Sequence, residues 1–418
     1  MDRDLLENYF HHAVAAAQPG RVVASHLPER PRGRTIVIGA GKASAQMARA
    51  FELAWDAPID DSLVVTRYGY GATCERIEIV EAAHPVPDMA GYFAARRLLE
   101  KLSGLSHDDL VVALISGGGS ALLPQPAPGL SFEDEQAVNE VLLASGAPIG
   151  VMNLIRNQLS AVKGGRLAAV AAPARVATLI VSDIPGDDPA LVASGPTVPM
   201  AATRVDARKA AELYRLALPP AAAELLASDL NPPPAPDDAR FAHNTVRVIA
   251  SATLSLEAAA SAAKTDGLTP HILSDAVEGE SRDVGLVHAA LAREIAARNR
   301  PFGKPALVLS GGETTVTIRG NGKGGRNSEF LLSFALAIEG VAGITALAAD
   351  TDGIDGMGTN AGAFADGTTA ARLRAKGLDP RALLANNDAY TAFETLGDLF
   401  APGPTGTNVN DFRAIVVR

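Results

Sequence analysis

Short apolar runs that end in glycine or aspartate clusters recur along this chain, and they constrain its fold more than any other feature. The runs begin at positions 35, 110, 176, 246, 306 and 344. Strands this apolar are buried on both faces, which is typical of parallel sheets covered by helices. Helical patterns follow several of the clusters, and another covers residues 5–17. The alternation predicts an α/β fold.

The length and the prolines predict how the chain divides. A chain of 418 residues suggests two domains, because domains usually hold about 100–200 residues. Four prolines lie within Asn231–Asp238, where they would end a helix or interrupt a sheet. We therefore expect a linker there, between an N-terminal domain over residues 1–235 and a C-terminal domain over residues 236–418.

Charge and cysteine content exclude several classes of protein. The chain has 37 basic and 47 acidic residues and a net charge of −10, so neither nucleic acid nor an anionic membrane is an expected partner. The one cysteine, Cys74, cannot form an intrachain disulfide, which suits a reducing compartment. The N-terminus is unlike a signal peptide, and no apolar run is long enough to span a membrane. We therefore expect a cytoplasmic protein.

The glycine-rich segments that follow the apolar runs are the first candidates for a binding site. In open parallel sheets, ligands bind at the carboxyl ends of the strands. Glycine there lets backbone N–H groups approach an anion, and a following helix N-terminus attracts negative charge. Gly39–Lys42 and Ser116–Ser120 fit this description, and Lys42 is placed where an anion would lie. A tight turn or close packing between loops is the alternative for each.

A third glycine-rich segment, Arg319–Ser328, carries the cations Lys323 and Arg326. Its residues 320–325 match Gly-x-Gly-x-x-Gly, which is a weak signal by itself. Thr314–Ile318 before it has a strand-like pattern, and a helical pattern follows it. An anion-binding loop and a mobile surface hairpin are both open interpretations.

Cations also recur at helical spacing. Arg156, Lys163 and Arg166 are seven and three residues apart, which places them on one face of a helix expected over residues 152–170. Two glycines between Lys163 and Arg166 interrupt the helical pattern. The stripe is either a solvated face or an anion-binding face.

Aspartates follow two of the apolar runs. They are Asp183, Asp187, Asp188, Asp350, Asp352 and Asp355. Mg²⁺ needs only one or two carboxylates in addition to substrate phosphates, so either group could hold it. Turn formation and helix capping are the ordinary alternatives for aspartate. His84 is a second-rank candidate for a base or a ligand, although such a histidine more often fixes a turn.

Taken in order, these segments resemble those of one family, the glycerate 2-kinases. The resemblance runs from about residue 5 to the C-terminus. The segments similar to the N-terminal domain of that family are Gly39–Ser44, His84–Asp88, Leu114–Ala121, Ser182–Asp187 and Ala193–Thr197. Those similar to its C-terminal MOFRL domain are Ser310–Thr314, Gly324–Glu329, Asp350–Gly356 and Thr405–Asp411.

The resemblance implies ATP-dependent phosphorylation of D-glycerate at its 2-hydroxyl, with Mg²⁺. The implied fold is a Rossmann-like α/β/α domain with a parallel sheet and a smaller α/β MOFRL domain, with the active site in the cleft between them. The implied partners are small-molecule substrates, and a homodimer is left open.

The resemblance and the chemistry of phosphoryl transfer together imply roles for particular residues. Lys42 and Arg326 are expected to stabilise the transferring phosphoryl group. Asp183 or Asp187 is expected to orient or deprotonate the 2-hydroxyl, or to hold Mg²⁺. The expected contacts to substrate or phosphate are Gly41, Ser116, Gly117, Gly118, Gly119, Ser120, Arg156, Lys163, Gly311, Gly312, Glu313, Thr314 and Asn327, and the expected metal ligands are Asp350 and Asp352.

Two other functions stay open. An NAD(P)H-dependent hydroxypyruvate reductase would need a dinucleotide fingerprint, and Ser44 stands where that pattern has a glycine. A non-catalytic sensor that closes on a phosphorylated ligand would bind without turnover. An assay with D-glycerate and ATP, against hydroxypyruvate and a reduced nicotinamide cofactor, separates the two enzymes.

Overall fold

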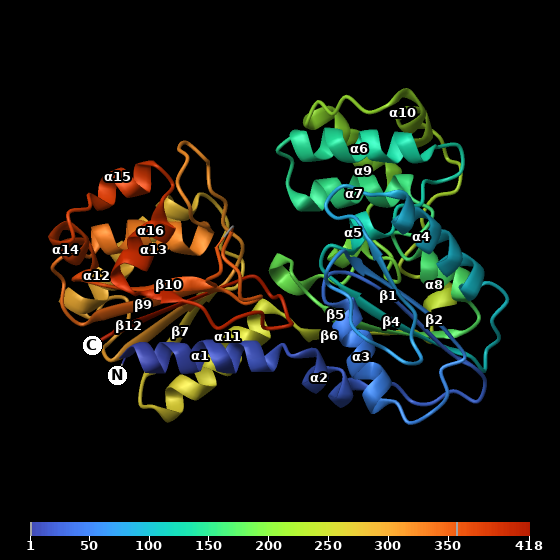
Figure 1. Ribbon diagram of the computed structural model, residues 1–418. Coiled ribbons are helices and arrows are strands. Elements are labelled where there is room, and N and C mark those ends of the chain that lie inside the picture. The colour runs from blue at the N-terminus through green and yellow to red at the C-terminus, as the bar shows by residue number, and fades with distance from the viewer. Residues whose placement is uncertain (1, 357) are drawn as a thin grey trace. The chain divides into compact units, whose positions relative to one another are not determined.

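The computed structural model describes residues 2–356 and 358–418, which fold into two compact units. Pro19–Ile249 forms the N-terminal unit. Ala250–Arg418, together with the residues up to Gln18, forms the C-terminal unit. Each unit is built on one six-stranded sheet with helices packed against it (Figure 1).

The N-terminal unit extends past the proline-rich segment at which the sequence predicts a linker. β6 (Thr245–Ala250) joins the sheet of this unit beside β5 (Arg175–Val181). The proline-rich segment is itself anchored, since the carbonyl of Asn231 accepts hydrogen bonds from Arg166 (3.1 Å) and Arg204 (3.2 Å). The boundary between the compact units therefore lies after Ile249 rather than after residue 235.

The first helix belongs to the C-terminal unit, although the sequence analysis assigns it to the N-terminal domain. α1 (Asp2–Ala16) buries Leu6, Tyr9 and Phe10 in a core shared with α11 (Ala252–Thr265) and the second sheet. Figure 1 shows α1 alongside α11. The expected helix is confirmed, but an amphipathic pattern does not indicate which sheet the helix covers.

The first sheet has the parallel arrangement that the apolar runs predict. Its other strands are β1 (Thr35–Ala40), β2 (Asp61–Arg67), β3 (Ile79–Ala82) and β4 (Leu110–Ser116). The order is β3-β2-β1-β4-β5-β6, and the pairs from β3 through β5 are parallel. Every residue of β1 and β4 is buried, as expected for strands covered on both faces.

Helices of two kinds complete the N-terminal unit. Those near the sheet are α2 (Pro19–Val22), α3 (Ser44–Ala54), α4 (Met89–Leu102), α5 (Gly119–Leu122) and α8 (Arg166–Ala171). A separate helical cluster with its own apolar core contains α6 (Phe132–Ala144), α7 (Ile149–Leu159), α9 (Arg204–Leu213) and α10 (Pro220–Ala227). No expectation from the sequence corresponds to this cluster.

The second sheet is mostly antiparallel, which corrects the expectation of parallel strands. Its strands are β7 (Thr269–Ser274), β8 (Ala306–Ser310), β9 (Ile344–Asp350), β10 (Gly362–Asp366), β11 (Leu399–Phe400) and β12 (Asp411–Val417). The order is β11-β10-β9-β12-β8-β7, and only β7 and β8 pair in parallel.

Helices cover both faces of this second sheet, which explains why its strands are so apolar. α1 and α11 pack on one face. On the other face lie α12 (Ser281–Arg298), α13 (Arg326–Ala337), α14 (Thr369–Ala375), α15 (Pro380–Ala385) and α16 (Ala389–Leu396). Burial on both faces therefore predicts helical cover, and it does not determine strand direction.

Strand direction brings particular ends of the second sheet together. β8 and β9 are each antiparallel to β12, which lies between them. The carboxyl ends of β8 and β9 and the amino end of β12 therefore share one edge. The predicted strand Thr314–Ile318 is absent, and only Thr315 forms a bridge, to Glu280.

None of the described helices is long and apolar enough to cross a membrane.

Candidate active site

Parallel strand ends bring three of the predicted segments together in the N-terminal unit. β1, β4 and β5 are neighbours in the sheet, and their carboxyl ends point the same way. Gly41–Lys42, the glycine loop Ser116–Ser120 and Asp183 follow these ends. They meet at the edge where ligands bind in sheets of this kind.

Glycine is required at this edge because neighbouring groups fill the space where a Cβ would lie. A Cβ at Gly117 would overlap the carboxylate of Asp183. A Cβ at Gly41, where φ is +141°, would overlap Ser116. Close packing between loops, one of the interpretations that the sequence leaves open, is therefore present, and it places Asp183 directly against the glycine loop.

The first turn of α3 is engaged by the glycine loop. The backbone N–H of Lys42 donates to the carbonyl of Gly117 (2.8 Å), and that of Ala43 donates to Ser116 Oγ (3.0 Å). Ser44 Oγ also lies 3.1 Å from Ser116 Oγ. Backbone N–H groups in this position bind the pyrophosphate in a dinucleotide site. Here they hold two loops together instead.

His84 lies among cations beside the glycine loop. Its Nε2 and the Cγ of Lys42 are 3.0 and 3.2 Å from the place of a Cβ on Gly118. Burial, followed by the charges of Lys42, Arg67 and Arg156, lowers the pKa of His84 to about 4. The imidazole is therefore neutral at pH 7 and a weak base.

The cations around His84 have no carboxylate partner among the described residues. The guanidinium of Arg67 lies over the Tyr70 ring, 4.3 Å from its centroid. Arg156 hydrogen-bonds to side-chain amides. Within the described part of the chain, neither arginine forms an ion pair, and nor does Lys42. Their positive charge is available to an anionic ligand.

Two of the three cations expected on one helix face are structural. The helix predicted over residues 152–170 is broken into α7 and α8, with Lys163 in the loop between them. Lys163 is buried, and its Nζ donates to Glu135 Oε1 and to the carbonyl of Leu123, each at 3.0 Å. Arg166 is also buried and donates to backbone carbonyls. Neither is therefore placed to present its charge to a ligand, whereas Arg156 is bonded to the neutral amides of Asn139 and Asn153.

Asp187, the other candidate for orienting the 2-hydroxyl, lies further along the chain. It ends the short turn Pro185–Asp187 and has a φ of +53°. Its backbone N–H donates to the carbonyl of Ile184 (3.3 Å). Asp183, which follows the strand directly and lies against Gly117, is the better placed of the two carboxylates.

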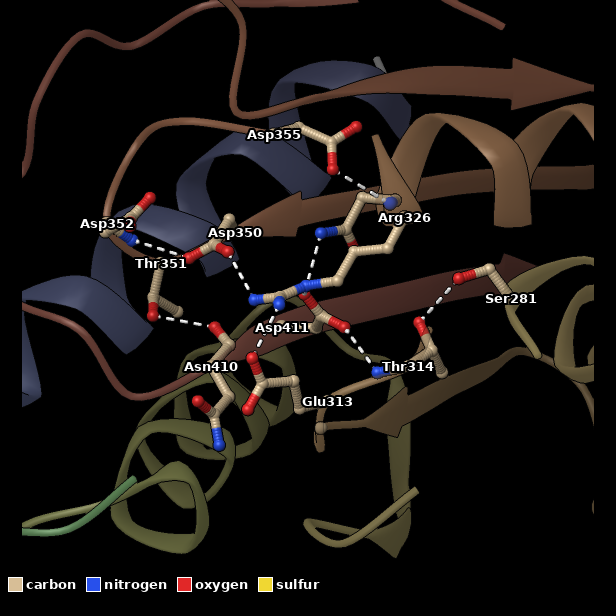
Figure 2. Close-up of polar contacts among 12 residues, drawn as sticks. Ser281, Glu313, Thr314, Arg326, Asp350, Thr351, Asp352, Asp355, Asn410 and Asp411 are labelled. Carbon is tan, nitrogen blue, oxygen red and sulfur yellow. Dashed lines mark hydrogen bonds and ion pairs between the residues drawn. The ribbon is translucent and has the colours of Figure 1, made fainter. Parts of the chain in front are cut away.

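In the C-terminal unit, charged side chains gather around Arg326 at the shared strand edge (Figure 2). Arg326 opens α13. Its Nε donates to Asp411 (2.7 Å), its Nη1 to Glu313 (2.7 Å) and its Nη2 to Asp350 (2.5 Å). Glu313 follows β8, Asp350 ends β9 and Asp411 begins β12, so the sheet topology accounts for their convergence.

These carboxylates hold Arg326 in its charged form. Burial acts to lower the pKa of Arg326, but Asp411, Asp350 and Glu313 together raise it above its ordinary value. A second arginine, Arg413, is fully buried and donates to Asp411. Carboxylates therefore outnumber cations in this cluster, and Arg326 is engaged by carboxylates rather than presented to an anion.

Other predicted contacts in this unit position Asp411. The backbone N–H of Thr314 donates to Asp411 Oδ2 (3.4 Å), and Asn327 Nδ2 donates to its Oδ1 (2.7 Å). Both residues are buried. The carbonyl of Gly311 accepts from the N–H of Val277 (3.1 Å), and a Cβ on Gly312 would overlap the Val277 backbone. These contacts fix the backbone on both sides of Glu313 and so fix the position from which its side chain extends.

The metal role of Asp350 and Asp352 stays a prediction. Both oxygens of Asp350 are engaged, one by Arg326 and the other by the N–H of Asp352 (3.1 Å). Asp352 Oδ1 accepts from the N–H of Ile354 (2.8 Å). No group of three or more His, Cys, Asp or Glu side chains among the described residues could hold a metal ion. Turn formation, the alternative for these aspartates, accounts for the bonds to the N–H groups of Asp352 and Ile354.

The segment Arg319–Ser328 is packed against the turn Asn386–Asp388. Cβ atoms on the glycines at 320 and 322 would overlap that turn. The backbone N–H of Lys323 donates to Asp388 Oδ1 (3.0 Å), and its Nζ lies 3.6 Å from the centroid of the Tyr390 ring. The Gly-x-Gly-x-x-Gly pattern therefore reflects close packing between loops, rather than a mobile hairpin.

Several residues at these edges are not among the site residues that the sequence predicts. They are Arg67, Asn153, Ser194 and Asp411. Ser194 and Asp411 lie in segments that resemble family motifs, which was the available signal. Arg67 and Asn153 carry no local signal, because Arg67 reaches the site through the pairing of β2 in the sheet and Asn153 through the packing of α7.

Comparison with known proteins decides the family. A model for a domain of unknown function, DUF4147, matches residues 5–227, and the MOFRL family model matches residues 306–411. The D-glycerate 2-kinase of Thermotoga maritima is 38% identical, over 96% of this chain and 94% of that protein. This chain belongs to the glycerate 2-kinase family. A glycerate 2-kinase of Pyrococcus horikoshii is 40% identical, over 92% of this chain and 88% of that protein.

Other relatives of this glycerate 2-kinase family member agree in structure and differ in name. The crystal structure of the Thermotoga maritima glycerate kinase matches with a TM-score of 0.90 at 38% identity, over 99% of both chains. A protein of Agrobacterium vitis with the provisional name hydroxypyruvate reductase is 50% identical, over 99% of this chain and 94% of that protein. Both names that the sequence left as alternatives therefore occur among its relatives.

Proposed function

We propose that this chain transfers the terminal phosphoryl group of ATP to the 2-hydroxyl of D-glycerate. The observation that carries the proposal is the cationic strand-end site of the N-terminal unit, where Lys42 and His84 both lie against Gly118 and the charges of Lys42, Arg67 and Arg156 act on His84. Both substrates are anions, and phosphoryl transfer is catalysed mainly by positioning and by charge neutralisation. The family relatives supply the identity of the acceptor.

Lys42 is assigned to the transferring phosphoryl group. It lies beside Gly118 and the glycine loop. Asp183 is assigned to the acceptor hydroxyl, which it would orient or deprotonate from its position against Gly117. A carboxylate and a lysine at adjoining strand ends provide the acid–base partner and the charge that the reaction needs.

We propose that Mg²⁺ accompanies ATP. The ion would neutralise phosphate charge, and Mg²⁺ needs only one or two protein carboxylates because it keeps water and phosphate ligands. Asp350 would have to exchange Arg326 for the ion, since its Oδ2 lies 2.5 Å from Arg326 Nη2. Asp183, whose carboxylate lies against Gly117 at the cationic site, is the other candidate ligand.

Arg326 would present more of its guanidinium to a phosphoryl group if one of its three carboxylate partners were released. Glu313 is the partner that can move, because its side chain is 57% exposed, compared with 7% for Asp350 and 0% for Asp411. We therefore infer that Asp350 and Asp411 keep Arg326 in place and that a phosphate oxygen replaces Glu313.

The alternative, hydroxypyruvate reduction, fits the site less well. A nicotinamide dinucleotide needs backbone N–H groups at the first strand-to-helix turn. Those of Lys42 and Ala43 are bonded to the glycine loop.

Two assays on the purified full chain distinguish the functions. One follows ADP release in the presence of ATP, Mg²⁺ and D-glycerate, and the other follows NADH or NADPH oxidation with hydroxypyruvate. We expect ADP release that depends on D-glycerate and no cofactor oxidation. Reduction of hydroxypyruvate without D-glycerate-dependent ADP release would overturn the proposal, and ligand binding without either turnover would indicate a sensor.

A cytoplasmic location is part of the same proposal. ATP is the phosphoryl donor, and the single cysteine, Cys74, suits a reducing compartment.

A further inference from the structure

A row of polar side chains connects Ser120 of the glycine loop to Arg156, and its two inner members, Asn153 and Ser194, have no role in the function described above. Ser120 Oγ lies 2.5 Å from Ser194 Oγ. Ser194 Oγ lies 3.0 Å from Asn153 Oδ1, which also accepts from Arg156 Nη1 (3.4 Å). Asn153 and Ser194 are buried. Buried polar groups that are bonded to one another in this way fix a single arrangement.

The direction of the hydrogen bonds in this row follows from its buried end. Asn153 Nδ2 donates to the carbonyl of Leu191 (3.1 Å), so its oxygen faces Ser194. Ser194 donates its one hydroxyl proton to that oxygen. Ser120 must then donate its own proton to Ser194. The oxygen of Ser120 is left with acceptor capacity only, which suits a hydroxyl group of a ligand.

Ser194 is held in this row in an unfavourable backbone conformation. Ala193 and Ser194 have φ values of +52° and +60°, and Gly195 follows with +56°. Only the last of these residues adopts the left-handed region readily. Such conformations persist where the surrounding structure requires them, and they collect at functional sites.

Arg156 has neutral partners where a guanidinium usually has an anion. Its Nε donates to Asn139 Oδ1 (2.9 Å) and its Nη1 to Asn153. Burial lowers the pKa of Arg156, whereas the charge of Glu135 raises it. Glu135 is itself bonded through Oε1 to Lys163 (3.0 Å). A planar guanidinium with donors to spare matches a carboxylate in bidentate geometry.

We propose that Arg156 binds the carboxylate of the hydroxy-acid substrate while Ser120 accepts a hydrogen bond from a hydroxyl of the same molecule. Asn153 and Ser194 are positioning residues that hold both groups. The proposal rests on the proposed function for the identity of the acid. Binding by Arg156 and Ser120 would make the site select a hydroxy acid over an uncharged polyol.

Calorimetric binding of D-glycerate, without ATP, tests the carboxylate contact directly. We expect Arg156→Met to weaken binding by about 10–100-fold, as for a lost hydrogen bond to a charged group. Lys209→Met, which removes one exposed cation from the helical cluster of the same unit, is the matched control and should bind like wild type. Equal binding by Arg156→Met and wild type would overturn the proposal.

A comparison of D-glycerate with its uncharged methyl ester separates a contact from a general loss of structure. Wild type should favour the acid in kcat/KM by about 10-fold or more, and in Arg156→Met this preference should fall towards one. A variant that is merely damaged loses both activities equally and keeps the preference, which would contradict the proposal. The KM for ATP should stay within about twofold of wild type.

Ser194→Ala tests the positioning role. Removal of the hydroxyl leaves Ser120 and Asn153 without their shared partner, so we expect KM for D-glycerate to rise about 5–10-fold while kcat and the KM for ATP are kept. An unchanged KM for D-glycerate would contradict this role.

Failure of the proposed function has a different signature. Weakened D-glycerate binding in Arg156→Met without any phosphorylated product from wild type would leave this inference standing and overturn the kinase proposal. Normal product formation by wild type together with unaltered D-glycerate binding in Arg156→Met would leave the kinase proposal standing and overturn this inference.

Discussion

Lys42 is the residue on which the cationic site depends most. It lies against Gly118 beside a neutral His84. Negative charge on the transferring phosphoryl group needs this cation in the transition state. We predict that Lys42→Ala lowers kcat by about 100-fold or more, as measured by ADP release under saturating substrates.

The control for this prediction is Lys209→Ala, since Lys209 is an exposed lysine of the same unit. Circular dichroism should show that both variants are folded. A kcat for Lys42→Ala close to that of wild type would remove Lys42 from the reaction.

Residues next to a glycine cluster could be predicted from the sequence, and the others could not. Lys42 and Asp183 follow apolar runs directly, so the rule for strand ends found them. Lys163 was expected to bind an anion, but its ammonium is bonded to Glu135 (3.0 Å) in the interior. A lysine near glycines can bind an anion or form a buried ion pair. Only the packing of α6 against the loop after α7 decides between these two roles for Lys163.

At the scale of elements, the start of α13 depends on an aspartate from another segment. Gly325 at the N-cap offers no side chain. Asp355 accepts instead from the N–H groups of Asn327 (3.0 Å) and Ser328 (2.9 Å), and from the Ser328 hydroxyl. It is 1% exposed. Arg326, the first residue of the helix, is positioned through this cap.

We predict that Asp355→Ala lowers the free energy of unfolding by about 2–4 kcal/mol, because buried N–H groups lose their acceptor. Urea titration measures the change. The matched control is Asp379→Ala, which removes an exposed cap on Arg381 of α15 and should cost about 0.5–1 kcal/mol. Equal losses in the two variants would show that Asp355 is an ordinary surface cap.

Element types were predictable, and the directions of strands in the second sheet were not. The apolar runs at 306 and 344 correctly indicated β8 and β9. Their neighbour β12 comes from the C-terminus and separates them as an antiparallel strand. Pairing between segments so distant in sequence leaves no local signal, although it is what brings Asp411 to Arg326.

At the scale of the whole molecule, the N-terminal helix stabilises the end of the chain. Phe10 is fully buried, and its ring lies 4.9 Å from that of Phe400 and 5.8 Å from that of Phe412, between centroids. We predict that Phe10→Ala destabilises the C-terminal unit by about 3–5 kcal/mol. Hydrogen exchange should show lost protection in β9 and β12 and unchanged protection in β1 and β4.

The matched control is Phe93→Ala, since Phe93 of α4 is 54% exposed. It should leave exchange in both sheets nearly unchanged. Loss of protection in β1 and β4 after Phe10→Ala, with β9 and β12 unaffected, would contradict the assignment of α1 to the C-terminal unit.

Division into two units was predictable from length, but the bounds were not. A proline-rich segment marks where helix and strand stop, and it does not show that the next strand belongs elsewhere. β6 follows Asn231–Asp238 and still joins the first sheet. The chain therefore enters the C-terminal unit twice, once through α1 and once after Ile249.

The central claim, phosphoryl transfer from ATP to the 2-hydroxyl of D-glycerate, is tested most directly by proton-coupled ³¹P NMR of the product. Carbon 2 of glycerate bears one hydrogen and carbon 3 bears two. The protein should convert D-glycerate and ATP into ADP and a phosphate monoester whose signal is a doublet. A triplet would place the phosphate on the 3-hydroxyl, and the absence of any new monoester signal would contradict the kinase assignment itself.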